Sequence, residues 1–466
     1  MDITKFLDEN YKDAALYILY RQTASYVDGL KNAARKAVFT VKKTGLKSQL
    51  KVTAFGSEVI KEAEYLHGEV SIQGTTVTMA ADFCGANNLP ILRGIGSFGT
   101  RFVPVASAPR YIFVRPPEYF DLLFKKADDV NLVEQNFEGK KIDPVFYVPT
   151  LPVILLNGTE GIGVGFASDI LPRSIENVIK LTRAAIKKEK LKDEWFVPNF
   201  HGFTGEVKKG LNKKGEPTWY VTGRASRVGK KVTIEEIPMT YDLAGYRNYL
   251  YSCRDKDIIT KFYDFSEDDN FKFEVILDED EAKKKDEEIW DDLGLVTTMP
   301  ENLNCIDENN VIREYNDIKD IFRDYFNIKI KYLKLRIKSE VVRLKKEESD
   351  LKETYDFIQE VIKGTVVLKN KKKADVEAEL KKKGYTIIER LVAMPLYSIT
   401  ADKAKEIEKR WKDKVKERQA MEKEEPENFW LRDIDELEAE LKKEGFIGVT
   451  PEKKTTKKKE TKNGKK

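Results

Sequence analysis

The chain has 466 residues, of which 35% are charged, and its 83 basic residues nearly balance 79 acidic ones, giving a formal net charge of +4. That length allows about three domains, and so small a net charge does not by itself indicate a nucleic-acid partner. The three cysteines have no CxxC spacing and no apolar run approaches a membrane span, which argues against a disulfide framework, a zinc site and a membrane protein.

Basic residues follow the first turn signal of the chain. Asp28-Gly29 predicts a turn, and Lys31, Arg35 and Lys36 come directly after it, at the start of the next predicted helix. Lys31 and Arg35 are four residues apart and therefore share one helix face. A cationic helix face beside a glycine turn suits contact with phosphate groups. The alternative is that these side chains only face solvent and bind nothing.

His67 is one of two histidines in the chain and lies between two predicted helices. The first helix is expected around Ser57–Tyr65 and the second over Val70–Asp82. A lone histidine is more often structural than catalytic, so its position alone assigns no role.

A glycine-rich loop is expected after Arg93, with a backbone able to approach a bulky polar group such as a phosphate. The loop residues are Gly94, Gly96, Ser97, Gly99 and Thr100. Four arginines are expected to surround the loop with guanidinium groups, namely Arg93, Arg101, Arg110 and Arg115.

Tyr111 follows the small-residue run Ala106–Pro109 and precedes the β-type run Ile112–Val114, which predicts a position where a loop enters a strand. A phenol can attack phosphorus, but it is mostly protonated at neutral pH, so cationic neighbours such as Arg110 are needed. A tyrosine taken at random is a packed ring with a solvated hydroxyl, so this role depends on the neighbouring motifs.

The segment Tyr147–Gly165 predicts a buried apolar strand that runs into a glycine-rich loop. It contains no GxxxxGK[ST] and no GxGxxG that opens a helix, so a nucleotide-binding loop is not indicated. Three further strands are expected, at Trp219–Thr222, Lys231–Ile237 and Phe271–Leu277. The acidic run Asp278-Glu279-Asp280 has the chemistry of a magnesium site, but no glutamate on a neighbouring strand completes it, and we expect no metal there.

The region from about residue 315 to 445 is helical and heavily charged. Its apolar stripe from Ile318 to Ile362 predicts one helix of roughly 45 residues, and a return helix is expected from near Thr400. The apolar segment Leu391–Thr400 lies between them, and we expect two copies of the chain to meet there, a plain coiled-coil spacer being the alternative. A lysine-rich tail follows, either screening phosphates or only aiding solubility.

Several of these motifs occur in a fixed order at short spacings: Tyr65–Glu69, Ala86–Asn88, Gly96–Arg101 and Arg110–Ile112. Together with DGLK at residues 28–31 and NGTEGIGVG at residues 157–165, this succession closely resembles the breakage-reunion core of type IIA DNA topoisomerases. The resemblance covers about residues 10–440. One departure is that Asn32 and Ala33 stand where the family has a proline and its neighbour.

The resemblance implies roles for particular residues. Tyr111 would attack a DNA phosphate and become linked to the 5′ end, while Arg110, Arg21 and His67 complete the catalytic group, with Tyr65 as the aromatic neighbour of His67. Ile162 would wedge between base pairs and bend the duplex. The other DNA contacts implied are Lys31, Arg35, Lys36, Asn88, Ser97, Thr100 and Arg101.

The resemblance also implies a mixed α/β multidomain fold. A winged-helix cleavage domain is expected at residues 1–125 and an α/β tower domain with the DNA-bending loop at 126–312. A long antiparallel coiled coil ending in a dimer gate is expected at 313–445, before the tail at 446–466.

The implied activity is ATP-dependent passage of one duplex through a transient double-strand break in another, giving relaxation or decatenation. The chain shows no ATP-binding domain and no metal-binding TOPRIM domain, so Mg²⁺ and ATP are expected on a partner subunit that carries both. The other partners expected are double-stranded DNA and a second copy of this chain. The expected compartment is the cytoplasm.

Two other classes of protein remain open at this point. One is a non-enzymatic architectural DNA binder built on a winged helix and a coiled-coil dimer. The other is a tyrosine recombinase, which would need a different set of Arg and His motifs and no long coil.

Overall fold

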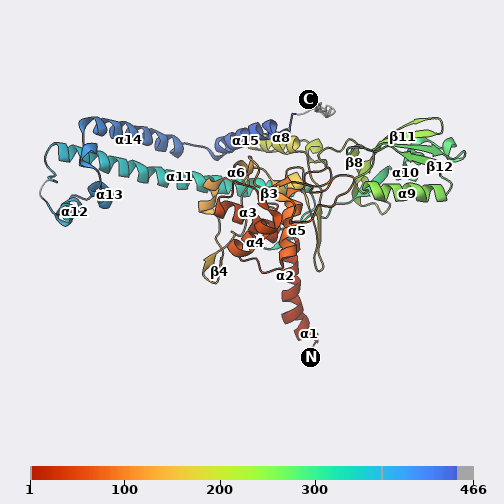
Figure 1. Cartoon of the computed structure of the whole chain (residues 1–466), viewed down its shortest axis with the longest axis horizontal. Helices are drawn as coiled ribbons and strands as arrows, with labels where there is room; N and C mark the ends of the chain where they lie inside the picture. The colour runs from red at the N-terminus through yellow and green to blue at the C-terminus, as the bar shows by residue number, and fades with distance from the viewer. Residues whose placement is uncertain (1–2, 369–370, 449–466) are drawn as a thin grey trace, which may run out of the picture. The chain divides into compact units, whose positions relative to one another are not determined.

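The computed structural model describes residues 3–368 and 371–448 (Figure 1). These residues form two compact units. Of the described residues, unit 1 comprises 3–126, 132–328 and 431–448, and unit 2 comprises 127–131, 329–368 and 371–430. Unit 1 therefore joins most of the first two expected domains, and the division falls inside the long helix. From residue 449 on, the expected tail lies outside the described residues.

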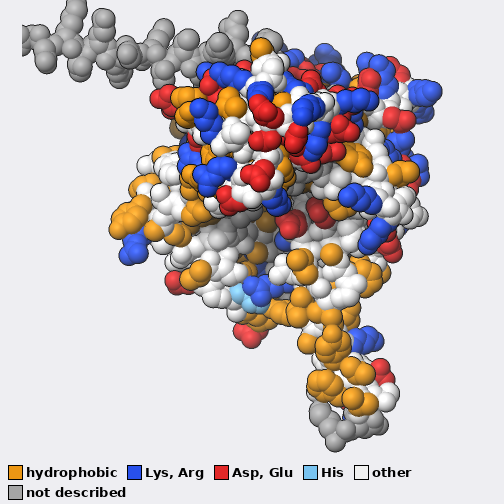
Figure 2. Space-filling view, turned by 90° about the vertical axis from the view of Figure 1, so that its right-hand side faces the viewer, with side chains coloured by type: hydrophobic (Ala, Val, Ile, Leu, Met, Phe, Trp, Pro, Cys, Tyr) orange, Lys and Arg blue, Asp and Glu red, His pale blue; other side chains and the backbone are white. Residues whose placement is uncertain are grey.

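The N-terminal helical segment projects from unit 1, as Figure 1 shows. It is made of α1 (Ile3–Lys5), the π-helix η1 (Phe6–Tyr11) and α2 (Lys12–Gln22). Its surface carries exposed apolar side chains, seen at the bottom of Figure 2: Ile3, Phe6, Leu7, Tyr11, Tyr17 and Ile18.

Three helices and a small antiparallel sheet form the next part of unit 1. The elements are α3 (Asn32–Thr44), α4 (Val52–Ala63), α5 (Glu69–Ala80), β1 (Leu50–Lys51), β2 (Arg93–Ile95) and β3 (Phe113–Arg115). The sheet order is β1-β3-β2. Phe55, Ile72 and Val114 are fully buried in this part, so its helices and the sheet share a core. The helix predicted over Val70–Asp82 is confirmed as α5.

The apolar strand predicted in Tyr147–Gly165 is wrong. Val153–Asn157 form helix α7 instead, and the following residues form a hairpin of β6 (Thr159–Ile162) and β7 (Ala167–Ile170). A short apolar run that is buried all round has no periodicity to separate helix from strand. Here Pro152 at the N-cap and Gly158 with φ +66° at the C-cap allow a single helical turn.

Two sheets follow in unit 1. One has the order β10-β11-β13-β12 and the other the order β14-β9-β8. Their strands are β8 (Glu206–Leu211), β9 (Pro217–Thr222), β10 (Arg224–Val228), β11 (Lys231–Glu236), β12 (Ile259–Asp264), β13 (Phe273–Leu277) and β14 (Val296–Met299). The three predicted strands are thus confirmed as β9, β11 and β13. Helices α9 (Leu243–Asp255) and α10 (Asp286–Asp292) share a buried core with the four-stranded sheet, including Tyr246, Phe273 and Ile289.

Unit 1 also contains further helices and short strands. They are α6 (Phe120–Leu123), β4 (Asn136–Phe137), β5 (Lys140–Lys141), α8 (Ile175–Ile186), β15 (Asn304–Ile306), β16 (Ile312–Glu314) and α15 (Pro426–Lys443). Ion pairs hold α15 to unit 1, with Arg183 bound to Asp435 and Glu438 and Lys125 bound to Asp433.

Unit 2 is helical. Helix α11 (Ile318–Ile362) has 45 residues, which confirms the predicted length, and α14 (Ala401–Glu422) is capped by the Thr400 side chain, which confirms the predicted start of the return helix. Contacts such as Lys345–Glu422 and Tyr355–Trp411 show that the two helices run antiparallel. The tip contains α12 (Lys373–Lys382) and α13 (Ile388–Val392), whose apolar residues pack around Phe357, Leu380 and Leu391.

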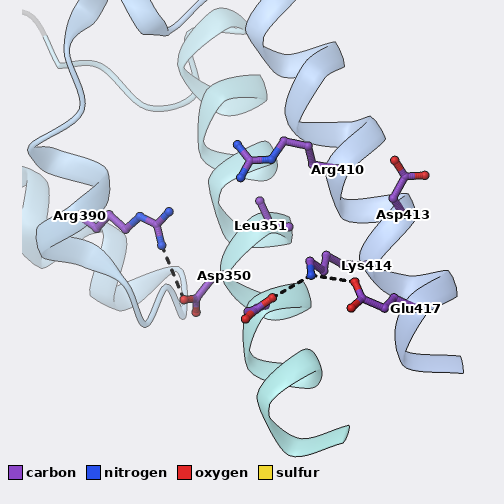
Figure 3. A pocket seen from close by; sticks show the side chains of 8 residues that line it. Asp350, Leu351, Arg390, Arg410, Asp413, Lys414 and Glu417 are labelled. Atoms are coloured by element: carbon purple, nitrogen blue, oxygen red, sulfur yellow. Dashed lines mark hydrogen bonds and ion pairs between the residues drawn. The ribbon is translucent and has the colours of Figure 1, made fainter. Parts of the chain in front are cut away.

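Oppositely charged side chains line a cavity of about 300 Å³ beside the paired helices of unit 2 (Figure 3). Lys414 of α14 lies 3.1 Å from Glu347 of α11, and Arg390 of α13 lies 3.7 Å from Asp350. These pairs join the helices across a polar surface.

None of the helices in the described parts of the chain combines the length and apolar character needed to cross a membrane.

Candidate functional site

Tyr111 is 70% exposed at the point where the chain enters β3, as the sequence predicted. The alternation of the strand explains this, since Ile112 and Val114 are buried and direct their neighbours outward. The Tyr111 backbone N–H donates to the Ala108 carbonyl, 2.9 Å away, in the turn before the strand. The guanidinium carbon of Arg110 lies 5.5 Å from the centroid of the phenol ring. The structure therefore presents a surface phenol beside a cation.

The other three arginines expected around the glycine loop do not surround an open site. Arg93 and Arg115 both pair with Glu118, at 2.9 Å and 2.8 Å. Arg101 is buried and donates to the backbone oxygens of Tyr241 and Pro238, so its expected direct contact with DNA is replaced by a role inside unit 1. Of the four expected arginines, Arg110 alone is exposed at the site.

His67 lies just before α5, between two tyrosine rings. The Tyr17 hydroxyl is 2.7 Å from His67 Nε2, and the Tyr65 ring makes an edge contact with the imidazole at 5.2 Å between centroids. Arg21 donates to Ser71 Oγ over 3.2 Å, which joins α2 to α5. Burial, followed by the nearby charge of Arg21, lowers the pKa of His67 below its ordinary value, so the imidazole is neutral at neutral pH.

Lys31 connects the start of α3 to the β6–β7 hairpin. Its Nζ donates to the backbone oxygen of Glu160 over 2.6 Å. Burial lowers the pKa of Lys31, and the charge of Glu160 opposes that effect. Ile162 at the end of β6 is 77% exposed, as an apolar side chain that inserts into a ligand must be.

Arg35 and Lys36 lie inside the fold, and this changes the sequence interpretation. Arg35 forms a bidentate pair with Asp28 at 2.7 Å and 3.0 Å, and Lys36 pairs with Asp143 at 2.7 Å. Both side chains are about nine-tenths buried. Their charges are neutralised internally, so they support α3 in place of the direct DNA contact expected.

Asn88 is also buried, and its amide joins separate segments of unit 1. It donates to the carbonyls of Arg173 and Asn199 and accepts from the His201 N–H. Its expected role in DNA contact is therefore not supported by its position. The Thr100 hydroxyl accepts from Val103 N–H within its own turn, whereas Ser97 is exposed at the loop surface.

The acidic side chains of the described residues do not fit a magnesium ion. These residues contain no group of three or more His, Cys, Asp or Glu side chains able to hold a metal. In the acidic run considered above, Glu279 pairs with Lys230 and Asp280 pairs with Lys283. Because lysines already neutralise these carboxylates, this part of the chain does not fit the ion.

Sequence reasoning missed three residues that shape the site. Tyr17 binds His67, Asp28 holds Arg35, and Asp169 lies opposite Glu160 in the hairpin. Tyr17 and Arg21 are four residues apart on α2, so they share a face, and that spacing was the available signal. No comparable spacing pointed to the pairing of Glu160 with Asp169.

The exposed groups suit phosphoryl transfer to tyrosine. Tyr111 offers a solvated nucleophile, and Arg110, Arg21 and Lys31 offer cations that attract a polyanion. Within the described chain no contact joins Tyr111 to Arg21, Lys31 or His67 directly.

Comparisons with known proteins agree with this chemistry. Residues 21–435 match the family model that describes the A subunit of DNA gyrase/topoisomerase IV. The chain is 28% identical over 477 residues to DNA topoisomerase 2 of Arabidopsis thaliana, covering 91% of this chain and 32% of that protein. It is 30% identical over 379 residues to DNA topoisomerase 2 of Bombyx mori, covering 78% of this chain and 24% of that protein.

A solved structure is similar over most of the chain. It is the crystal structure of the Plasmodium falciparum topoisomerase II DNA-binding, cleavage and re-ligation domain, with a TM-score of 0.84 and 26% identity. The match covers 94% of this chain and 64% of that chain. The chain spans about a third or less of the length of the curated relatives named here.

Proposed function

Since the chain belongs to the family of DNA gyrase/topoisomerase IV A subunits, we propose that it cleaves and rejoins DNA as part of a type II topoisomerase. The observation that carries the proposal is the 70% exposed Tyr111, at the entrance to a strand and beside the guanidinium of Arg110. A buried phenol would be unable to reach a duplex, whereas this one is open to a ligand as large as DNA.

In the proposed reaction the phenolic oxygen of Tyr111 attacks a backbone phosphorus. A bond forms between the phenolic oxygen and phosphorus, the bond from phosphorus to the 3′ oxygen breaks, and the 3′ hydroxyl leaves with a proton. The phenolic proton is released to solvent or to a base. Because one phosphodiester replaces another, resealing is the reverse attack by the 3′ hydroxyl and needs no new energy input.

The cations and the imidazole have separate roles in this proposal. Arg110 is adjacent to the nucleophile and stabilises the negative charge that develops on the phosphorane. Arg21 and Lys31 hold the DNA backbone, and neutral His67 donates a hydrogen bond to phosphate oxygen. Arg35, Lys36, Asn88 and Arg101 are left out of the contact surface because their polar groups are bound inside unit 1.

The hairpin supplies the proposed bending element. Ile162 is an exposed apolar side chain on β6, beside the glycine-rich turn. Inserting such a side chain between base pairs costs a few kcal/mol per unstacked step, which new backbone contacts offset. A bent duplex would bring its phosphates toward Arg21, Lys31 and Tyr111 together.

The finer architecture belongs to the same proposal. We assign the helices and small sheet within residues 1–125 as a winged helix, residues 126–312 as the tower, and the helices of unit 2 as a coiled coil whose tip pairs with a second copy. The winged-helix assignment is supported by α3, α4 and α5 packing with the β1-β3-β2 sheet. The exposed Tyr397, next to the apolar tip, supports the pairing of the tip with a second copy.

Type II topoisomerases use Mg²⁺ and ATP, and we propose that a partner subunit carrying the ATPase and TOPRIM domains binds both. The magnesium would polarise the phosphate and the leaving oxygen, and ATP would drive passage of the second duplex. This division of labour is that of the medium subunit of a tailed-bacteriophage enzyme, which would act in the cytoplasm of the bacterial host.

The test is to trap the covalent product. The chain is incubated with Mg²⁺, its partner subunit, ATP and end-labelled duplex DNA, and the mixture is then denatured rapidly with detergent and heated to separate the DNA strands. Label at the 3′ end should enter the protein fraction, whereas label at the 5′ end should not, because Tyr111 would hold the 5′ side of the break. Tyr111→Phe should abolish the adduct while leaving DNA affinity unchanged, and Tyr251→Phe, at another exposed tyrosine, should behave as wild type.

The same experiment separates the alternatives. An architectural DNA binder would shift the DNA in a gel but leave no protein-linked end after denaturation. A tyrosine recombinase would retain the 5′-labelled strand, because it would link protein to the 3′ side. Adducts that persist in Tyr111→Phe would reject the assignment of the nucleophile.

A further inference from the structure

Tyr17 lies on α2, fifty residues before the imidazole that it contacts. Its hydroxyl is 2.7 Å from His67 Nε2, and the two rings are tilted with 5.8 Å between centroids. Within the described chain Nε2 is the one ring nitrogen of His67 with a protein partner. The other nitrogen, Nδ1, therefore remains available to a ligand.

We propose that Tyr17 is a positioning residue that holds neutral His67 with its proton on Nδ1, so that Nδ1–H points to the substrate phosphate. This inference rests on the proposed function for the identity of the ligand. The hydrogen bond itself is a property of the chain and can be tested without DNA.

In this proposal the Tyr17 O–H donates to Nε2, because a phenol is a good donor and a neutral imidazole nitrogen is a good acceptor. Accepting at Nε2 places the imidazole proton on Nδ1. A neutral imidazole with Nδ1–H donates one hydrogen bond to an anion without adding a charge to the site.

The surroundings of His67 keep it neutral and limit its rotation. From α2 the ring is faced by Tyr17 and Arg21, and from the preceding segment by Tyr65. Arg21 is the charged group among these, and with burial it lowers the pKa of His67. The Tyr65 hydroxyl donates to Ser71 Oγ at 3.0 Å, so its ring is itself fixed against the imidazole.

The two histidines of the chain make a direct measurement practical. The full chain is labelled with ¹⁵N and ¹³C at histidine, and His201→Asn identifies the signals of His67. In the wild-type chain above pH 7.5, the nitrogen shifts should report a proton on Nδ1. In Tyr17→Phe the proton should move toward Nε2, and the pKa of His67 should rise toward its ordinary value, since the bond to its neutral form is lost.

Tyr65→Phe is the matched control. It removes a hydroxyl from the other ring beside His67 but not the bond at Nε2, so the tautomer should stay on Nδ1. If wild-type His67 carries its proton on Nε2, or if Tyr17→Phe leaves both the tautomer and the pKa unchanged, the proposal is wrong.

A second measurement ties the pair to the reaction. With Mg²⁺ and the partner subunit present, Tyr17→Phe should slow adduct formation about fivefold, the factor expected for one neutral hydrogen bond, at unchanged DNA affinity. An unchanged rate would reject the positioning role even if the tautomer moves. If the wild-type chain forms no adduct at all, the proposed function fails, and the nitrogen shifts still decide the state of His67.

Discussion

Lys31 Nζ donates a 2.6 Å hydrogen bond to the backbone oxygen of Glu160. This bond joins the residue before α3 to the strand that carries Ile162. A side chain expected to hold a phosphate thus also fixes the base of the proposed wedge. In the proposed function, this one ammonium group would link binding of DNA at Lys31 to bending at Ile162.

Replacing Lys31 should therefore loosen the hairpin. Lys31→Met removes the donor but keeps the length of the side chain. We expect the loss of this hydrogen bond to destabilise the packing of the hairpin by about 1 kcal/mol. Hydrogen–deuterium exchange should rise in residues 159–170, and fluorescence energy transfer should show a smaller bend in bound duplex. Lys61→Met is the control, because Lys61 is exposed and pairs with Glu58 and Glu62 on its own helical segment. Unchanged exchange in the hairpin would contradict the link.

Gly161 is expected to tolerate no side chain. A Cβ atom there would lie 2.1 Å from the backbone oxygen of Gln22, so the hairpin or α2 would have to move. Gly161→Ala should destabilise unit 1 by about 1–3 kcal/mol in urea unfolding and reduce DNA bending. Gly74→Ala is the matched control, since Gly74 lies in α5 with open space around it and gains helix propensity. Equal stability of the two variants would show that the hairpin is not seated on Gln22.

Asp169 should make stability depend on pH. Burial, then the charges of Glu160 and Glu301, raise its pKa from 3.8 to about 6. The folded chain then binds the proton more tightly than the unfolded chain, so this residue's contribution to stability falls as pH rises from about 4 to 6. At pH 7.5, Asp169→Asn should be more stable than wild type by about 1 kcal/mol, since partial solvation reduces the effect.

The measurement for Asp169 is the free energy of unfolding of both chains at pH 4.5 and pH 7.5. The advantage of Asp169→Asn should shrink at the lower pH. Asp121→Asn, which affects an exposed carboxylate paired with Lys47, should show no such trend. An advantage of the same size at both pH values would mean that folding does not raise the pKa of Asp169.

The buried pair of Asp28 and Arg35 should dominate the stability of the region around α3. Asp28 is fully buried and also accepts from the Leu30 and Tyr147 backbone N–H groups, at 3.0 Å each. Asp28→Asn leaves the buried Arg35 charge without its hydrogen-bonded carboxylate and should cost about 3–5 kcal/mol in urea unfolding. Asp28→Asn combined with Arg35→Met should recover part of this loss. A cost as small as that of Asp121→Asn would contradict the internal role of Arg35.

Much of the fold was predictable because its elements have clear periodicity. The apolar stripe from Ile318 to Ile362 predicted α11, and alternation predicted β11. The failure at Val153–Asn157 has a physical cause, since a run of apolar residues buried on every side carries no period. The return of α15 to unit 1 depends on ion pairs between residues more than 250 positions apart, which no local pattern encodes.

The position of a site residue was predictable where it depends on residues close to it in the sequence. The small-residue run Ala106–Pro109 before Tyr111 and the β-type run Ile112–Val114 after it predicted its place between loop and strand, and the exposure of its ring is what the structure adds. Arg35 and Lys36 were predicted to face DNA because a cation on a helix suggests solvent. Their partners, Asp28 and Asp143, neutralise them in the interior, and the second lies over a hundred residues away. Burial of a charge is decided by such distant partners.

The route of the chain has a consequence for its synthesis. Unit 1 is interrupted after residue 328 and resumes at residue 431, so unit 2 is an insertion within it. During translation the ribosome makes every residue of unit 2 before it makes the part of α15 that returns to unit 1. Lys125 and Arg183, which bind this helix, therefore stay uncovered until it is made. The last stage of unit 1 folding follows the synthesis of unit 2 and is slower than the formation of the helices within unit 1.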